Sequence, residues 1–163
     1  ATVEGGVHLN GATVEGGVYL NEATVKGGVH LNGATVKGGV YLNEATVEGG
    51  VHLNGATVEG GVIDSAAPNI PDLDRCILTA INATPGGKLE QAAWHTCETA
   101  HCRAGWAVIV AGTAGAALEK RLGTPAAAAA LYTASGLAVP DFYDTNNARV
   151  LSSIRARSNK LQV

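Results

Sequence analysis

The sequence has no methionine, 4% aromatic residues and 15% charged residues, against ~25% charged residues in an ordinary soluble domain. It contains no apolar run of about 18 residues that could cross a bilayer, and no cationic stretch followed by an apolar run as in a signal peptide. Its net charge of −3 comes without a basic stripe, which argues against nucleic-acid binding. Its three cysteines are too few for a disulfide scaffold. These absences favour a soluble, cytoplasmic protein without nucleic-acid or membrane partners.

Glycine, in contrast, is abundant, and most of the 22 glycines precede residue 62, whereas all five prolines follow it. Residues 1–61 repeat a unit of eleven residues, which reads ATVEGGVHLNG, ATVEGGVYLNE, ATVKGGVHLNG, ATVKGGVYLNE and ATVEGGVHLNG before it fades in ATVEGGVIDSA. Short repeats are typical of stacked solenoids. We therefore predict two domains, a β-solenoid of six units over residues 1–63 and an α-helical capping domain over residues 64–163.

Within each unit the residues alternate between apolar and polar. Ala1, Val3, Val7 and Leu9 point inward in this pattern, with polar residues between them, which is the two-residue period of a strand with one buried face. The Gly-Gly pair and the Asn-Gly or Asn-Glu junction tolerate corners, where positive φ is often needed. Each unit is expected to form two short strands and two corners.

The positions that vary between units predict the length of a coil. Stacked strands lie about 4.8 Å apart, so each outward side chain neighbours its counterpart one coil away. A coil of 11 residues would stack Glu4 on Glu15, whereas a coil of 22 residues stacks Glu4 on Lys26. Only Glu22 over Glu44 then brings like charges together. We predict a four-sided, parallel β-solenoid of about three coils, right-handed by analogy with parallel crossovers, with uniform columns of histidine, tyrosine and glycine (His8, His30, His52; Tyr19, Tyr41; Gly11, Gly33, Gly55).

The repeat A-T-V-x-G-G-V-x-L-x-G resembles the eleven-residue β-solenoid repeats of bacterial proteins, which are related in shape to pentapeptide-repeat solenoids. The segment WHTCETAHCRAGW, from Trp94 to Trp106, resembles a C-terminal domain of bacterial repeat proteins, and that resemblance implies no activity. The units are almost identical, and Glu and Lys alternate by coil. We interpret the chain as an engineered or consensus array, with recent tandem duplication as the alternative.

After residue 62 the sequence predicts helices. Pro71 opens the first, which runs to about Ala83, and Pro85-Gly86-Gly87 forms a turn. Further helices are expected over residues 99–111 with Thr99 as N-cap, 113–122, 125–134 and 147–157, the last capped by Thr145 or Asn146. This region is expected to cover the exposed edges of the last coil, with a set of large apolar residues at or near the seam (Ile63, Trp94, Trp106, Phe142).

Two groups of side chains could bind metal. His95, Cys97, His101 and Cys102 are zinc-ligand types, but adjacent residues of a helix point about 100° apart, so convergence would need an unusual turn. A Cys97–Cys102 disulfide, reduced thiols and a Cys–His nucleophile are the other interpretations, and buried reduced thiols are favoured. The histidine column (His8, His30, His52) could share a metal ion or form a plain exposed ladder. The threonine ladders lack the regular T-x-T array of ice-binding faces.

The first coil begins directly in the repeat, so its strand edges and four inward valines are expected to be open (Val3, Val7, Val14, Val18). Open edges favour pairing with another chain. The sequence therefore predicts a non-catalytic structural scaffold without a cofactor, which forms a homodimer through its N-terminal coil. A metal-binding module and a natural protein-interaction repeat are the alternatives.

Overall fold

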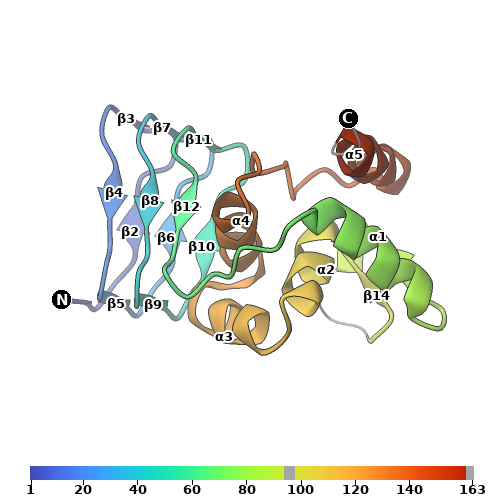
Figure 1. The fold of residues 1–163 in the computed structure, drawn as a ribbon. Coiled ribbons are helices and arrows are strands. Elements are labelled where there is room, and N and C mark those ends of the chain that lie inside the picture. Colours follow the sequence, from blue (N-terminus) through green and yellow to red (C-terminus); the bar gives the residue numbers. More distant parts are fainter. Residues whose placement is uncertain (94–97, 161–163) are drawn as a thin grey trace.

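The computed structural model describes residues 1–93 and 98–160. Within these ranges, residues 1–63 form twelve two-residue strands in four parallel, three-stranded sheets, one on each side of a solenoid (Figure 1). The strands are β1 (Thr2–Val3), β2 (Val7–His8), β3 (Thr13–Val14), β4 (Val18–Tyr19), β5 (Thr24–Val25), β6 (Val29–His30), β7 (Thr35–Val36), β8 (Val40–Tyr41), β9 (Thr46–Val47), β10 (Val51–His52), β11 (Thr57–Val58) and β12 (Val62–Ile63).

The register confirms the predicted coil of 22 residues. Thr2 pairs with Thr24, which pairs with Thr46, and the other three sheets repeat this offset. The inward residues form the core, since Val25, Val29 and Leu31 of the middle coil are fully buried. Burying a side chain of this size contributes roughly 1.5–3 kcal/mol, so stacked coils obtain from each other the core that one coil lacks.

The two kinds of corner use glycine for different reasons. At the Asn-Gly and Asn-Glu corners the backbone is left-handed, as predicted, with φ of 66° at Gly11 and 58° at Glu22. At the Gly-Gly corners of the first two coils φ is not positive, which corrects the expectation. There the corners stack so closely that a Cβ on Gly27 would lie 2.7 Å from the amide nitrogen of Gly6.

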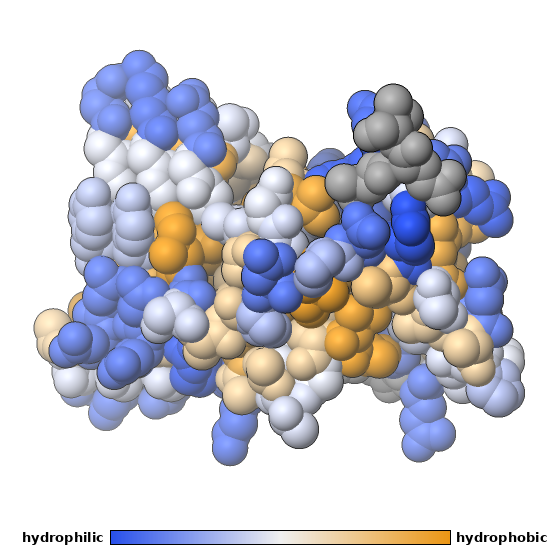
Figure 2. Space-filling view, in the orientation of Figure 1, coloured by the Kyte–Doolittle hydropathy of each residue, from blue (hydrophilic) through white to orange (hydrophobic). Residues whose placement is uncertain are grey.

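Outward side chains form ladders along the solenoid. Lys26 pairs with Glu4 at 3.2 Å, and Lys37 pairs with Glu15 at 2.8 Å. Among the described residues the lysines do not also pair with Glu48 and Glu59, so the charge ladder is paired only between the first two coils. Figure 2 shows hydrophilic side chains gathered along the upper and lower corners of this solenoid face.

The rest of the chain is mainly helical, and we call residues 73–160 the helical region. It contains α1 (Leu73–Ala83), α2 (Arg103–Val110), α3 (Gly112–Leu122), α4 (Thr124–Ala134) and α5 (Asn147–Asn159), with β13 (Lys88–Leu89), a 3₁₀ turn (Gln91–Ala93) and β14 (Ala100–His101). Asn146 caps α5, as predicted, by accepting from the amide of Arg149 at 2.9 Å.

The predicted start of α2 is wrong. Residues 100–101 form a strand that pairs with β13, so Thr99 is not the N-cap. Cys102 takes this position, where its Sγ accepts from the amide of Gly105 at 3.3 Å. Sequence reasoning missed the sheet because two-residue strands leave almost no periodic pattern.

A buried polar cluster joins four of the helices. Asp74 of α1 accepts from Arg103 of α2 at 2.7 Å and from the Tyr132 hydroxyl of α4 at 2.5 Å. Arg157 of α5 forms an ion pair with the other Asp74 oxygen at 3.2 Å. Burial raises the pKa of Tyr132, so its hydroxyl keeps the proton that it donates. The cluster fixes how the helices pack, since a buried charge without its partners would be costly.

Candidate functional site: the two ends of the solenoid

In the first two coils, backbone amides and carbonyls form hydrogen bonds with the next coil. The corresponding groups of the last coil need other partners. The amide of Leu9 donates to the carbonyl of His30, and the amide of Leu31 donates to that of His52. Leu53 occupies the same place in the third coil, where no fourth coil follows. Its amide donates instead to the hydroxyl of Tyr143 at 3.1 Å. A tyrosine of the helical region thus replaces a backbone carbonyl, and burial raises its pKa.

A second amide at this end is satisfied in the same way. Val18 and Val40 donate to carbonyls of the following coil, at 2.9 and 3.0 Å. Val62, the third member of this series, donates to Thr133 Oγ1 of α4 at 3.1 Å. The Thr133 hydroxyl donates in turn to the carbonyl of Ala129 at 2.9 Å. This hydroxyl therefore links the last coil to the backbone of α4.

Carbonyl groups of the last coil also find substitute donors. The carbonyl of Ala45 accepts from Arg121, whose guanidinium also pairs with Asp64 at 2.7 Å. The carbonyl of Gly49, which in earlier coils would accept from a glycine amide, accepts from His52 Nε2 at 3.0 Å. The end of the solenoid is thus closed by single side chains, each in the place of one backbone group.

Small side chains bring α4 close to the last coil. Residues 126–130 are five consecutive alanines, and all of them are buried. They let α4 pack against β10 and β12, while α3 lies beside β9 (Figure 1). Helices therefore cover three of the four strands of the last coil, namely β9, β10 and β12.

The first coil differs from the covered coils. Val3, Val7 and Val14 are only half-buried, and Val18 is 9% exposed, whereas the corresponding valines of the middle coil are fully buried. The free edge of the first coil carries both backbone amide donors and backbone carbonyl acceptors. In the second coil the amides of Thr24 and Lys26 donate toward the N-terminal end, and the carbonyls of Gly28 and His30 accept from it. The matching groups of the first coil have no backbone partner among the described residues (Thr2, Glu4, Gly6, His8).

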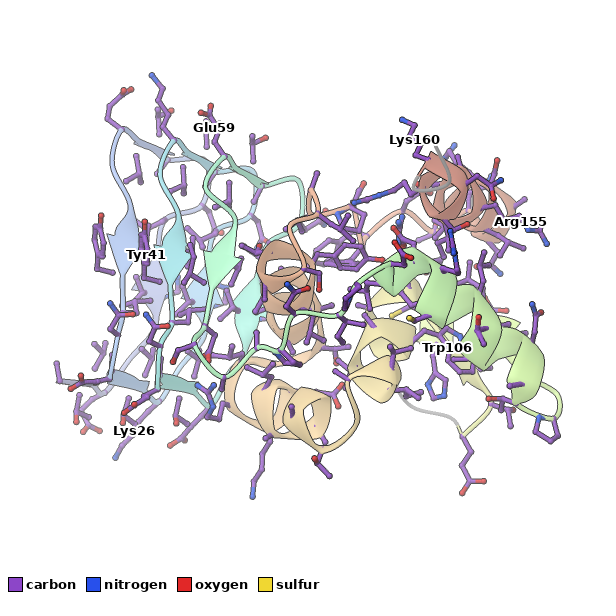
Figure 3. All side chains as sticks on the ribbon, viewed as in Figure 1. Lys26, Tyr41, Glu59, Trp106, Arg155 and Lys160 are labelled. Atoms are coloured by element: carbon purple, nitrogen blue, oxygen red, sulfur yellow. The ribbon has the colours of Figure 1, made fainter. Side chains whose placement is uncertain are left out.

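The large apolar residues expected near the seam lie in different places. Phe142 is buried edge-on to Tyr132 and lines a groove beside the last coil. Ile63 is half-buried and pairs with Tyr41 in the sheet. Trp106 lies inside the helical region, where its indole donates to the carbonyl of Lys88 at 3.0 Å (Figure 3). Trp94 lies outside the described residues.

The predicted cysteine–histidine cluster is described only in part, because His95 and Cys97 lie outside the described residues. His101 is buried and packs edge-on against Trp106, with ring centroids 4.8 Å apart. Cys102 is a buried free thiol, and burial raises its pKa, which opposes the thiolate that zinc requires. No group of three or more metal-ligand side chains lies together in the part of the chain that the structure describes.

The histidine column is a stack of parallel rings. The rings of His8, His30 and His52 follow one another at 4.7 Å, with interplanar angles of 4° and 6°. Zinc would need ring lone pairs that converge at about 2.0–2.1 Å, whereas stacked rings point theirs side by side. Burial, followed by the neighbouring charges of His52 and His8, lowers the pKa of His30, so the stack favours neutral rings.

Sequence reasoning missed the residues that close the last coil. Arg121, Thr133 and Tyr143 belong to no repeat, so they carry no local signature. One signal was present, because Asp64 stands where the earlier units have an inward leucine, such as Leu42. An acid in a core position indicates a buried partner, and this partner is Arg121.

The fold defines a repeat β-solenoid followed by a mostly helical region. Residues 1–46 match the signature of a family described as Pentapeptide repeats (9 copies), which supports a structural repeat protein. Neither a curated protein nor a solved structure matches the chain. Among the described residues, no helix is long and apolar enough to cross a membrane.

Proposed function

We propose that the protein is a non-catalytic structural scaffold of engineered or consensus origin, which self-associates through the face of its first coil. The near identity of the repeats and the change from Glu to Lys and back to Glu by coil support the origin. The single observation that carries the self-association is the contrast between the two ends. At the last coil side chains replace missing backbone partners, and at the first coil nothing does so in the described chain.

A second copy of the chain suits this face because the edge is self-complementary. It offers the amides of Thr2 and Glu4 as donors and the carbonyls of Gly6 and His8 as acceptors. Two such faces, related by a twofold axis, would satisfy one another and bury the half-exposed valines. Symmetric dimers with the same patch on both subunits are the commonest assemblies of soluble proteins.

Charge opposes this contact at low salt. The corners of the first coil carry Glu4, Glu15 and Glu22 and no lysine, because both lysines of the repeats lie in the second coil. Two first coils that meet would therefore bring like charges together. We expect added salt to strengthen the dimer by screening this repulsion.

Sedimentation velocity from low to high micromolar concentration tests the proposal. We expect a reversible dimer that is more stable in 0.5 M salt than in about 0.05 M salt. A matched variant, Thr2→Pro with Thr13→Pro, removes two edge amides that point away from the second coil, so it should remain monomeric. Wild-type protein that stays strictly monomeric at high micromolar concentration contradicts self-association.

A further inference from the structure

The cover over the last coil is incomplete on one of its four sides. Val47, Val51 and Val62 of β9, β10 and β12 are each 2% exposed, whereas Val58 of β11 is only half-buried. Ala56, next to β11, is also half-buried, while the matching Ala34 of the middle coil is 1% exposed. The free edge of β11 therefore differs from the other three edges of the same coil.

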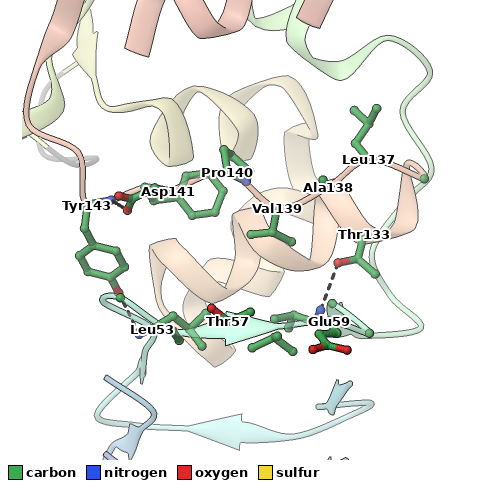
Figure 4. A pocket seen from close by; sticks show the side chains of 18 residues that line it. Leu53, Thr57, Glu59, Thr133, Leu137, Ala138, Val139, Pro140, Asp141 and Tyr143 are labelled. Carbon is green, nitrogen blue, oxygen red and sulfur yellow. Dashed lines mark hydrogen bonds between the residues drawn. The ribbon is translucent and has the colours of Figure 1, made fainter. Parts of the chain in front are cut away.

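A groove of about 570 Å³ lies over this edge, which is within the size range of ligand-binding clefts. Its floor is formed by residues 55–62, and its opposite wall by residues 136–143. The two substitute hydrogen bonds, from the amide of Leu53 to Tyr143 and from the amide of Val62 to Thr133, mark its ends (Figure 4). The groove thus occupies the place where a fourth coil would lay its strand over β11.

The floor offers backbone groups in the pattern of a parallel sheet. The amides of Thr57 and Glu59 donate to carbonyls of the middle coil, at 2.8 and 2.9 Å. Amides alternate along a strand, so the Val58 amide points into the groove. The carbonyl of Ala56 matches those of Ala12 and Ala34, which accept from the next coil, but it has no donor among the described residues. One donor and one acceptor are therefore available to an added strand.

The side chains around the groove define the chemistry of its occupant. Val58, Val139 and Phe142 supply apolar surface, and Val139 is 37% exposed. The charged residues among those that line the groove are Glu59 and Asp141, both acidic. In the same ladder one coil apart, Lys37 lies 2.8 Å from Glu15. A strand added to β11 would place one of its side chains over Glu59, just as Lys37 lies over Glu15.

We propose that this groove binds an extended peptide segment of a partner protein, which adds to β11 as a parallel strand. The segment carries a β-branched apolar residue over Val58 and a lysine over Glu59. Backbone hydrogen bonds supply affinity in such strand addition, and side chains supply specificity. In this chain the lysines of the repeats lie in the middle coil, which is already paired on both sides. The other lysines, Lys88, Lys120 and Lys160, follow Gly, Glu and Asn and not a β-branched residue, so a separate partner is the occupant.

The repeats themselves supply matched probes. The peptide of residues 32–38, NGATVKG, and the peptide of residues 54–60, NGATVEG, differ only at the lysine or glutamate position. Both would be acetylated and amidated at their ends and titrated into the ¹⁵N-labelled full chain. The shifts of the Gly55 and Val58 amide resonances report binding at the groove.

We expect the lysine peptide to bind about fivefold more tightly than the glutamate peptide at low salt, with a smaller ratio in 0.5 M salt. Glu59→Lys should reverse the preference, and this exposed residue can change without loss of the fold. Val58→Pro should weaken both peptides because it removes the amide that points into the groove. Equal binding of both peptides, no shift up to about 1 mM peptide, or an unchanged preference in Glu59→Lys would overturn the proposal.

Discussion

In the solenoid each buried side chain has a counterpart 22 residues away, whereas in the helical region the main buried polar cluster occurs only once. Val25 and Val47 fill the same core position one coil apart. In contrast, Asp74 alone joins Arg103, Tyr132 and Arg157. The repeat spreads its stability over many similar apolar contacts. The helical region has an apolar core of its own, which includes Leu73, Ile77 and Leu131, but its buried charges meet at one site. We therefore expect a single substitution in that site to cost more than one in the repeat.

The largest effect is expected at the buried cluster. Asp74→Ala leaves the 2% exposed Arg103 without its ionic partner, which should lower the free energy of unfolding by about 3–5 kcal/mol. Urea denaturation followed by circular dichroism measures this loss. The control is Arg149→Ala, which breaks a surface pair with Asp144 and should cost much less, because solvent screens exposed ion pairs. Equal effects of the two variants would contradict the special role of the cluster.

A smaller effect is expected at the stacked glycine corners. A Cβ on Gly27 would meet the amide nitrogen of Gly6 at 2.7 Å, whereas a Cβ on Gly5 meets nothing within 4 Å. Gly27→Ala should therefore destabilise the solenoid by roughly 1–3 kcal/mol, and Gly5→Ala should be nearly neutral. Thermal unfolding of the two variants measures the difference. If both tolerate alanine, close stacking is not why glycine recurs at this corner.

Breaking the contact between the solenoid and the helical region should lower the free energy of unfolding by less than Gly27→Ala does. Thr133→Val keeps the shape of the side chain but leaves the Val62 amide without its acceptor. The loss should be about 1 kcal/mol, measured by urea denaturation against Thr79→Val, which changes an exposed threonine of α1. A Thr133→Val variant as stable as Thr79→Val would show that the hydroxyl does not close the coil.

The smallest effect is expected at the histidine stack and depends on pH. The pKa of His30 is lowered in the folded protein, so the unfolded chain binds a proton more readily. The contribution of His30 to the stability is fully present above the pKa of histidine in the unfolded chain, about 6.5. It declines as the pH falls below that pKa. Melting temperatures at pH 7.5 and 5 should differ more for wild type than for His30→Gln. An identical pH dependence would show that stacking does not disfavour the charged ring.

The sequence was sufficient to predict the solenoid because its rules are local and repeated. The outward positions alone, Glu4 against Lys26, indicated the coil of 22 residues that the register confirms. The helical region resisted prediction beyond its helices, since the cluster of Asp74, Arg103, Tyr132 and Arg157 forms only after four helices pack. Tyr143 and Leu53 meet across 90 residues, and no spacing in the sequence relates them. The fading last unit indicated where the repeat ends, and Asp64, in a leucine position, indicated a buried partner there.

Hydrogen exchange of individual amides tests most directly whether side chains of the helical region replace a fourth coil. Leu53 and Val62 donate to Tyr143 and Thr133, whereas the Gly55 amide of the same coil has no partner in the described chain. We predict that Leu53 and Val62 exchange slowly and Gly55 exchanges fast. Equally fast exchange of all three amides would contradict the account.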